Sequence, residues 1–182
     1  MMSGRRIKIK NLLSELKLIV IDVDGVLTDG KLYYTEEGET FKVFDVKDGL
    51  GIKLVSKELN VAFLSGNPSP VIHTRAKSLG VSRCFTGISD KKTVLLSLME
   101  ELKIKSTEVA YIGDDWNDLT VRPFIGLFVC PLDAHRSVKK VADLILKSKG
   151  GNGAVREFVD YVLRSKGLYD TFWKEGLMEK NV

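Results

Sequence analysis

Short apolar runs rich in β-branched residues recur along the chain and predict the strands of a sheet. They lie at residues 18–23, 61–64, 109–112 and 127–130, with weaker runs at 83–86 and 142–146. Apolar runs without alternating polar residues are typical of strands that are covered on both faces. The pattern therefore predicts a sheet buried in the middle of the molecule.

Helical patterns separate these runs. Helices are predicted at about residues 69–80, 90–102 and 153–164. The first begins with Ser69-Pro70, a pair typical of a helix N-cap and first turn, and Gly80 is a typical helix end. Because strands and helices alternate from residue 50 onward, we expect an α/β fold, a Rossmann-like parallel sheet with helices on both faces. Ligands of such sheets bind beyond the carboxyl ends of the strands.

One segment interrupts the alternation. Residues 31–34 and 40–45 flank Glu37-Gly38, a pattern that predicts a β-hairpin directly after the first strand. The hairpin would expose Leu32, Tyr34, Phe41 and Val43. A two-stranded ribbon is only marginally stable in water, so we expect this one to pack against another chain.

The length of 182 residues and the 44% hydrophobic content are those of one globular domain. We expect this domain to span residues 16–166, between a flexible basic leader (1–15) and a C-terminal tail (167–182). The tail has no clear periodicity, yet it contains Leu168, Tyr169, Phe172 and Trp173. No core is left in the predicted domain to bury them, so we expect the tail to dock on a neighbouring subunit.

The net charge of +4 is concentrated in the leader, at Arg5, Arg6, Lys8 and Lys10. Without these four, the 28 basic residues fall to 24, which equals the 24 acidic residues. A basic terminus could touch nucleic acid or anionic lipid, but it is more often a solvated segment. We therefore expect neither nucleic acid nor a membrane as a partner.

Membrane and secretory signals are missing from the sequence. No apolar run approaches the ~20 residues of a membrane-spanning helix, and the leader has no apolar stretch like that of a secretory signal. The two cysteines, Cys84 and Cys130, are typical of reduced thiols, with Cys84 more readily interpreted as a small buried residue than as a reactive one. These features predict a cytoplasmic protein.

Candidate chemistry gathers at one edge of the predicted sheet. Asp22 and Asp24 end the first strand, Ser65 ends the second, Lys91 opens a helix, and the acidic segment 113–118 follows a later strand. Two carboxylates one residue apart form a simple turn about as often as a functional site. The convergence of four such features at one edge favours a site.

The chemistry that needs this set is phosphoryl transfer through an aspartyl-phosphate. A carboxylate can attack phosphorus, and Mg²⁺ with oxygen ligands can neutralise the negative charges that oppose the attack. A second carboxylate can protonate the leaving alkoxide and later deprotonate water. A lysine and a serine hydroxyl can hold the remaining phosphoryl oxygens. Mg²⁺ is therefore the expected cofactor.

These residues resemble the four motifs of the haloacid dehalogenase superfamily. The resemblance rests on Asp22-Val-Asp24-Gly25-Val26, Ser65, Lys91 and Gly113-Asp114-Asp115 with Asp118. It implies that Asp22 is the nucleophile, that Asp24 is the general acid and base, and that Ser65 and Lys91 bind the phosphoryl group. It further implies a magnesium site made by Asp22, the backbone carbonyl of Asp24, and Asp114, with Asp115 and Asp118 orienting the metal shell and Lys91.

Further segments, between about residues 16 and 163, resemble the 3-deoxy-D-manno-octulosonate 8-phosphate phosphatase family. They are Gly25-Val-Leu-Thr-Asp-Gly30, Phe44-Asp-Val-Lys-Asp-Gly49, Ser69-Pro70 with Arg75-Ala76 and Leu79-Gly80, Asp133-Ala-His135, and Gly150-Gly-Asn-Gly-Ala-Val-Arg-Glu157. The resemblance implies a phosphorylated 3-deoxy-2-keto sugar acid as substrate, a role in lipopolysaccharide precursor synthesis, and a capless homotetramer. Gly66, Asn67 and Arg75 become candidate substrate contacts.

The spacing of the motifs predicts the lack of a cap independently. The hairpin and one helix fill the chain between Asp24 and Ser65, and a helix and a weak strand fill the chain between Ser65 and Lys91. Neither segment can hold a cap domain. An uncapped site must accept bulky substrates or be closed by a neighbouring chain.

One departure from the family concerns the substrate. Members usually carry Gly-Arg-Lys after the motif serine or threonine, whereas this chain has Gly66-Asn67-Pro68, and Asn152 stands where related members often have arginine. Asparagine carries no charge, and proline removes a long cation and a backbone donor. The phosphatase assignment survives these changes, but the particular sugar acid stays open between the octulosonate 8-phosphate and a related nonulosonate 9-phosphate.

Three further side chains could serve structure or function. His73 lacks acidic neighbours at ligand spacing and is interpreted as a surface or interface residue rather than a metal ligand. His135 is interpreted as a structural loop residue rather than a substrate contact. Trp116 is interpreted equally as a core residue or as a wall that faces a substrate or an interface.

Two other functions stay open. A capless protein phosphatase would receive a phosphorylated loop in its open site, and a non-catalytic relative would serve as an assembly platform. The sugar-acid motifs argue against the first, and the retention of Asp22, Asp24, Lys91 and Asp114 argues against the second.

Overall fold

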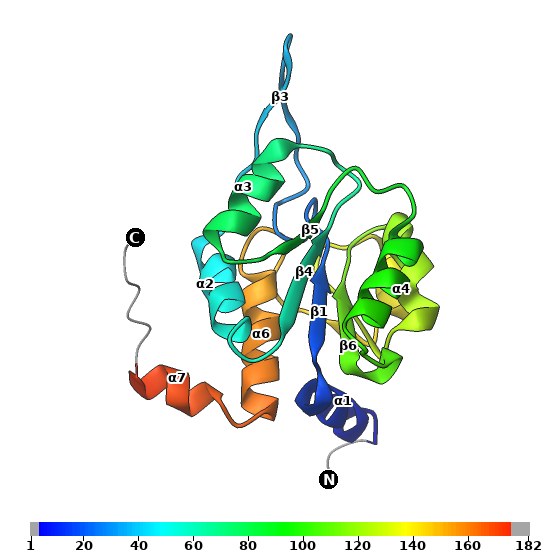
Figure 1. The fold of residues 1–182 in the computed structure, drawn as a ribbon, viewed down its shortest axis with the longest axis vertical. Coiled ribbons are helices and arrows are strands. Elements are labelled where there is room, and N and C mark those ends of the chain that lie inside the picture. The colour runs from blue at the N-terminus through cyan, green and yellow to red at the C-terminus, as the bar shows by residue number, and fades with distance from the viewer. Residues whose placement is uncertain (1–3, 176–182) are drawn as a thin grey trace.

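A six-stranded parallel sheet lies between two layers of helices in this protein (Figure 1). A computed structural model describes residues 4–175. The strands are β1 (Leu18–Ile21), β4 (Asn60–Leu64), β5 (Arg83–Phe85), β6 (Val109–Ile112), β7 (Leu127–Cys130) and β8 (Leu144–Ile145). They run in the order β5-β4-β1-β6-β7-β8, and every neighbouring pair is parallel. The predicted α/β fold class is confirmed.

The helices divide between the two faces of the sheet. They are α1 (Gly4–Glu15), α2 (Val46–Val55), α3 (Pro70–Ser78), α4 (Lys91–Glu101), α5 (Arg136–Val141), α6 (Ala154–Ser165) and α7 (Tyr169–Glu175), with the 3₁₀ helices η1 (Ser106–Glu108) and η2 (Trp116–Phe124). Helices α1, α2, α3, α6 and α7 pack on one face, and α4, α5 and η2 pack on the other. None of the described helices is long and apolar enough to span a membrane.

Alternation along β1 builds both cores. Ile19 and Ile21 pack with α2 and α6, whereas Leu18 and Val20 pack with α4 and η2. All four side chains are fully buried. Successive side chains of a strand point to opposite faces, so a run that is apolar at every position belongs in the centre of a covered sheet.

The predicted hairpin is formed by β2 (Tyr33–Thr35) and β3 (Gly38–Phe41). It projects from the end of the molecule opposite α1 (Figure 1). The predicted apolar side chains are exposed, with Tyr34 at 65% and Phe41 at 51% of their full areas. Within residues 4–175, the chain between Asp24 and Ser65 holds this hairpin, α2 and β4, and the chain between Ser65 and Lys91 holds α3 and β5. This arrangement confirms that there is no cap domain.

The basic leader is more ordered than we expected. Residues 4–15 form α1, whose Leu13 is buried and which contacts α6. The Nζ of Lys166, just past α6, donates to the Ser14 carbonyl over 2.9 Å. The apolar residues Ile9, Leu12, Leu13 and Leu16 recur at helical spacing, a signal that the neighbouring cations obscured.

The start of the tail also differs from expectation. Leu168 and Tyr169 pack against the core of their own chain, and the Arg164 guanidinium lies 3.5 Å from the centre of the Tyr169 ring. The expectation that no core remained for these two residues was wrong. Residues 176–182 lie outside the described part of the chain, as do the side chains of Phe172 and Trp173.

The docking of α1 can be measured by truncating Leu13. Leu13→Ala should lower the free energy of unfolding by about 2–5 kcal/mol, because it removes a buried leucine from a packed core. Ile7→Ala is the matched control, since Ile7 lies on the same helix and is 50% exposed, and it should change stability by at most about 0.5 kcal/mol. Urea denaturation checks both values. Equal, small effects would mean that α1 does not contribute to the core.

Candidate active site

The central strands of the sheet bring three of the predicted residues to one edge. Strand β1 lies between β4 and β6, so the carboxyl ends of these strands are adjacent. Asp22 follows β1, Ser65 follows β4 and Asp114 follows β6 by one glycine. The Asp22 N–H donates to the Ile112 carbonyl over 3.0 Å, which extends the β1–β6 ladder to the nucleophile candidate.

Lys91 is the centre of a buried ionic cluster. Its Nζ donates to Asp22 Oδ1 over 2.8 Å and to Asp118 Oδ1 over 2.7 Å. The Tyr111 hydroxyl donates to the same Asp118 oxygen over 2.7 Å. Lys91 and Asp22 are 2% and 4% exposed, and Asp118 is fully buried. The cluster joins the first residue of α4 to β1, β6 and η2.

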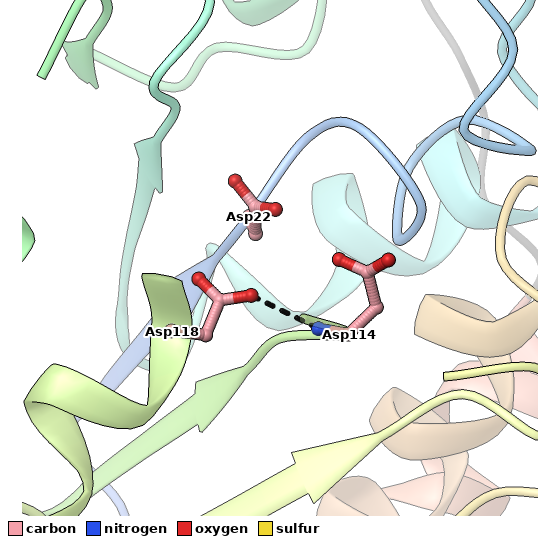
Figure 2. A group of neighbouring side chains, drawn as sticks. All are labelled: Asp22, Asp114 and Asp118. Carbon is pink, nitrogen blue, oxygen red and sulfur yellow. Dashed lines mark hydrogen bonds between the residues drawn. The ribbon is translucent and has the colours of Figure 1, made fainter. Parts of the chain in front are cut away.

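Asp118 organises the acidic segment that follows β6. Figure 2 shows its carboxylate accepting the hydrogen bond of the Asp114 N–H, a distance of 3.0 Å to Oδ2. The Asp115 N–H also approaches Oδ2, at 3.4 Å. Both oxygens of Asp118 are therefore engaged by the protein. Asp115 caps η2 by accepting the Trp116 N–H over 2.7 Å. Of these two aspartates, Asp118 is the one that accepts a hydrogen bond from Lys91.

Burial and mutual repulsion shift the pKa values in this cluster. Burial, followed by repulsion from Asp118, raises the pKa of Asp22 well above its usual value, although Lys91 opposes the shift. Burial and the neighbouring carboxylates Asp118 and Asp115 raise the pKa of Asp114 to about 7. Burial alone would lower the pKa of Lys91, but its two ion pairs outweigh this effect and raise it.

The residues fit a divalent cation. One carboxylate oxygen from each of Asp22, Asp114 and Asp118 lies within 4.8 Å of the others (Figure 2). One lysine balances only one of these three charges, and burial together with repulsion between the carboxylates raises the pKa values of Asp22 and Asp114. Hard oxygen donors with excess negative charge are the set that Mg²⁺ prefers. Since Asp118 is already engaged, Asp22 and Asp114 are the carboxylates that remain to face an ion.

Gly25 allows this close arrangement. Its φ of +85° lies in the left-handed region, and a Cβ at this position would collide with the Asp114 carboxylate. Glycine is the residue that accepts both constraints at little cost. The turn after β1 thus lets the Asp22–Asp24 segment lie directly against Asp114.

Asp24 is held by a lysine that sequence reasoning missed. The Lys42 Nζ donates to Asp24 Oδ1 over 2.7 Å, and the Lys42 side chain is 1% exposed. Lys42 follows β3, so it comes from the base of the hairpin. In the sequence it stands between two exposed apolar residues like any solvated hairpin lysine, and no local signal would have singled it out.

A cleft of about 620 Å³ opens over these groups. The predicted residues that line it are Asp22, Asp24, Ser65, Gly66, Asn67, Asp114 and Asp115, joined by Gly30, Trp116 and Asn117. Ser65 accepts the Asn67 N–H over 3.1 Å, and Asn67 Oδ1 accepts the Ser69 N–H over 2.8 Å. The segment that carries cations in the resembled family is thus a neutral turn in this chain.

Trp116 forms one wall of the cleft. It is 63% exposed, and its Nε1 donates to His135 Nδ1 over 2.9 Å, with the two rings meeting edge to face. His135 also caps α5 by accepting the Ser137 N–H. Trp116 is therefore a wall of the cleft and not a core residue, and the hydrogen bond to His135 holds its ring in place. His73 is a surface residue that contacts Thr86.

Arg75 does not reach the cleft. Its guanidinium donates to the Asp45 carbonyl over 3.2 Å and lies over the Phe44 ring at 5.5 Å. It therefore joins α3 to the start of α2 within this chain. Arg75 is not among the residues that line this cleft, and its role as a substrate contact stays a prediction.

Comparison with known proteins places the chain in a family. Residues 85–158 match the family model of haloacid dehalogenase-like hydrolases. Over 161 residues the chain is 41% identical to the 3-deoxy-D-manno-octulosonate 8-phosphate phosphatase KdsC of Haemophilus influenzae, an alignment that covers 88% of this chain and 89% of that protein. It is 38% identical to KdsC of Escherichia coli K12 over 156 residues, with coverages of 85% and 83%.

Solved structures agree. The 3-deoxy-D-manno-octulosonate 8-phosphate phosphatase of Moraxella catarrhalis, in complex with magnesium, phosphate and the sugar acid, superposes with a TM-score of 0.89 at 36% identity, covering 93% of this chain and 98% of that one. The fold and site thus define a haloacid dehalogenase-like hydrolase without a cap. Within that class, the chain belongs to the family of KdsC 3-deoxy-D-manno-octulosonate 8-phosphate phosphatases.

The raised pKa of Asp114 predicts how pH changes stability without metal. The pKa of an unfolded aspartate is ~3.9, whereas burial and the neighbouring carboxylates raise the pKa of Asp114 in the folded chain to about 7. Between these values the folded chain binds more protons than the unfolded one, so stability falls as pH rises through this window. In EDTA, Asp114→Asn should make this fall shallower and raise the melting temperature at pH 8.

The same variant should lose most of the stabilisation that Mg²⁺ gives the wild type at pH 8, because it loses a charged ligand. Asp170→Asn is the control, since Asp170 is an exposed aspartate outside the cluster, and it should follow the wild type throughout. Melting curves from pH 5 to pH 8 measure both effects. Identical pH slopes for wild type and Asp114→Asn would contradict the assignment.

Proposed function

We propose that this protein hydrolyses the phosphomonoester of a 3-deoxy-2-keto sugar acid, 3-deoxy-D-manno-octulosonate 8-phosphate or a related nonulosonate 9-phosphate, with Mg²⁺ as cofactor. The observation that carries the proposal is the buried Lys91, which bridges Asp22 and Asp118 beneath an acidic cleft. The 41% identity to KdsC of Haemophilus influenzae supports the choice of substrate. Such a reaction would belong to lipopolysaccharide precursor synthesis.

In this proposal Asp22 is the nucleophile. Its Oδ1 is held by Lys91, which leaves Oδ2 to attack phosphorus while the bond to the sugar oxygen breaks. The departing oxygen takes a proton from Asp24. Asp24 then takes a proton from water, whose oxygen attacks the phosphorus of the aspartyl-phosphate, and inorganic phosphate leaves as the Asp22 carboxylate is restored.

The remaining site residues bind and orient. Lys91 and the Ser65 hydroxyl hold the phosphoryl oxygens, and Asp118 keeps Lys91 in place from a fully buried position. The carboxylates of Asp22 and Asp114 and the backbone carbonyl of Asp24 would hold Mg²⁺, which supplies neutralisation of the phosphoryl charge. Asp115 supports the segment by capping η2.

The neutral Asn67-Pro68 turn and the Trp116 wall are the parts of the cleft that we expect to contact the sugar. Trp116 presents an exposed ring fixed by His135, a surface suited to the apolar face of a sugar ring. Within the described chain, the cleft lining contains no arginine or lysine. We propose that a neighbouring subunit supplies the cation for the substrate carboxylate.

We also propose a homotetramer in the cytoplasm. The exposed apolar side chains of the hairpin form the surface that would be buried between subunits. A cleft open to solvent at the carboxyl edge of the sheet would be closed by a neighbouring tail, of which residues 176–182 lie outside the described chain. The two free cysteines suit a reducing compartment.

The first test is activity against a panel of esters with Mg²⁺. 3-Deoxy-D-manno-octulosonate 8-phosphate should be preferred over a neutral sugar phosphate and over a phosphopeptide. Asp22→Asn should abolish turnover, and Asp24→Asn should lower kcat by about 10²–10⁴-fold on a sugar phosphate. Asp29→Asn, a surface aspartate of the same loop, is the control and should keep full activity. Preference for the phosphopeptide would favour the protein phosphatase, and the absence of all turnover would favour a non-catalytic platform.

The second test is assembly. Light scattering should give the mass of a tetramer, and Tyr34→Glu should dissociate it, because a charge would be buried in the hairpin interface. Leu96→Glu is the control: Leu96 is 37% exposed on α4, a helix that lies apart from the projecting hairpin (Figure 1), and this variant should remain tetrameric. A fully active wild-type monomer would refute both the tetramer and the shared site.

A further inference from the structure

Lys42 is unusually deeply buried for a lysine of a projecting hairpin. Its side chain is 1% exposed although it belongs to the base of a hairpin whose neighbouring side chains face solvent. Lysines are almost never buried this deeply unless their charge is paired. The pair is made with Asp24, at 2.7 Å between Nζ and Oδ1.

Strand alternation explains how Lys42 reaches the site. Phe41 and Val43 are 51% and 54% exposed, and Lys42 between them points to the opposite side. Because side chains alternate along an extended segment, Lys42, directly after β3, points inward. There it meets the turn that follows β1. Lys42 thus joins the base of the hairpin to Asp24.

The contact engages one half of the Asp24 carboxylate. Oδ1 accepts from Lys42, while the part of the chain that the structure describes gives Oδ2 no hydrogen-bond partner. Asp24 also lines the cleft, and its side chain is 26% exposed. One oxygen is therefore fixed and the other remains available to a substrate or a water molecule.

We propose that Lys42 is the positioning residue of Asp24, an assignment that rests on the function proposed above. When Asp24 gives its proton from Oδ2 to the departing sugar oxygen, it becomes a carboxylate, and the ammonium at Oδ1 stabilises the charge that develops. In the second step the same ammonium keeps Oδ1 in place while Oδ2 takes a proton from water. Lys42 touches neither the substrate nor phosphorus.

The test compares two leaving groups. A sugar alkoxide must be protonated as it leaves, whereas p-nitrophenolate is a weak base that leaves without a proton. Lys42→Met keeps the length of the side chain and removes the charge. With saturating Mg²⁺ it should lower kcat/KM, which reports the step that phosphorylates Asp22 and releases the sugar, by about tenfold or more for 3-deoxy-D-manno-octulosonate 8-phosphate, a part of the range that general acid catalysis contributes. The loss in kcat/KM for p-nitrophenyl phosphate should be several times smaller.

Three further variants make the comparison specific. Lys42→Arg restores the charge and should recover most of the lost kcat/KM. Lys31→Met is the matched control, because it removes a lysine just before the hairpin that pairs with Asp29 at the surface, and both activities should stay at wild-type level. In an Asp24→Asn background, Lys42→Met should cost nothing further, since a residue that acts through Asp24 has nothing left to position.

Several results would overturn the assignment. Equal losses in kcat/KM on both esters, or losses that multiply with Asp24→Asn, would make Lys42 a structural residue of the site, because kcat/KM does not include the water step that both esters share. A Lys42→Met variant with wild-type kcat/KM on the sugar ester would remove the role altogether. If Lys42→Met does not fold by its melting curve, Lys42→Gln replaces it in the same comparison. Wild-type protein that hydrolyses neither ester would refute the proposed function itself, and this failure is distinct from an active wild type with equal losses.

Discussion

A buried ammonium held between two buried carboxylates is the constraint on which the rest of this site depends. Taking three charged groups out of water is costly, and the cost is recovered only when geometry is good and the remaining lone pairs are satisfied. Lys91 meets this condition with two contacts below 2.9 Å, and Tyr111 and the Asp114 N–H complete Asp118. Because these groups come from β1, α4, β6 and η2, the cluster fixes the relative positions of all four elements.

The cluster is left with more negative than positive charge, and this imbalance links stability to function. Asp22 and Asp114 lie on neighbouring strand ends, where parallel pairing forces them together. Burial first, and then repulsion from neighbouring carboxylates, raises the pKa values of both groups. Sites that must bind a cation commonly carry such local instability, which a well-packed core elsewhere offsets. In this chain the sheet, buried on both faces, provides that core.

The two sides of the hairpin have different contacts. One side presents exposed aromatic and aliphatic groups, including the Tyr33 and Phe41 rings stacked at 4.5 Å, of which Phe41 is 51% exposed. The other side delivers Lys42 to Asp24. A ribbon that is marginally stable alone is therefore anchored at its base by a buried ion pair. In the proposed tetramer, the surface that joins subunits and the residue that positions the acid would belong to one small element.

The sequence by itself determined the sheet, the lack of a cap and the set of chemical groups. The strands of a buried parallel sheet appear in a sequence as continuous apolar runs. The motif residues follow these runs at the edge of the sheet where ligands bind, so the sequence alone could assign Asp22, Ser65 and Asp114 to that edge. Tertiary structure decided what local pattern does not encode. It brought Lys42 to Asp24, turned Arg75 toward Asp45, and docked α1 and Tyr169 on their own core. A lysine or arginine has the same local signature whether its charge lies in solvent or meets a buried partner, because only long-range packing settles which groups are taken out of water together.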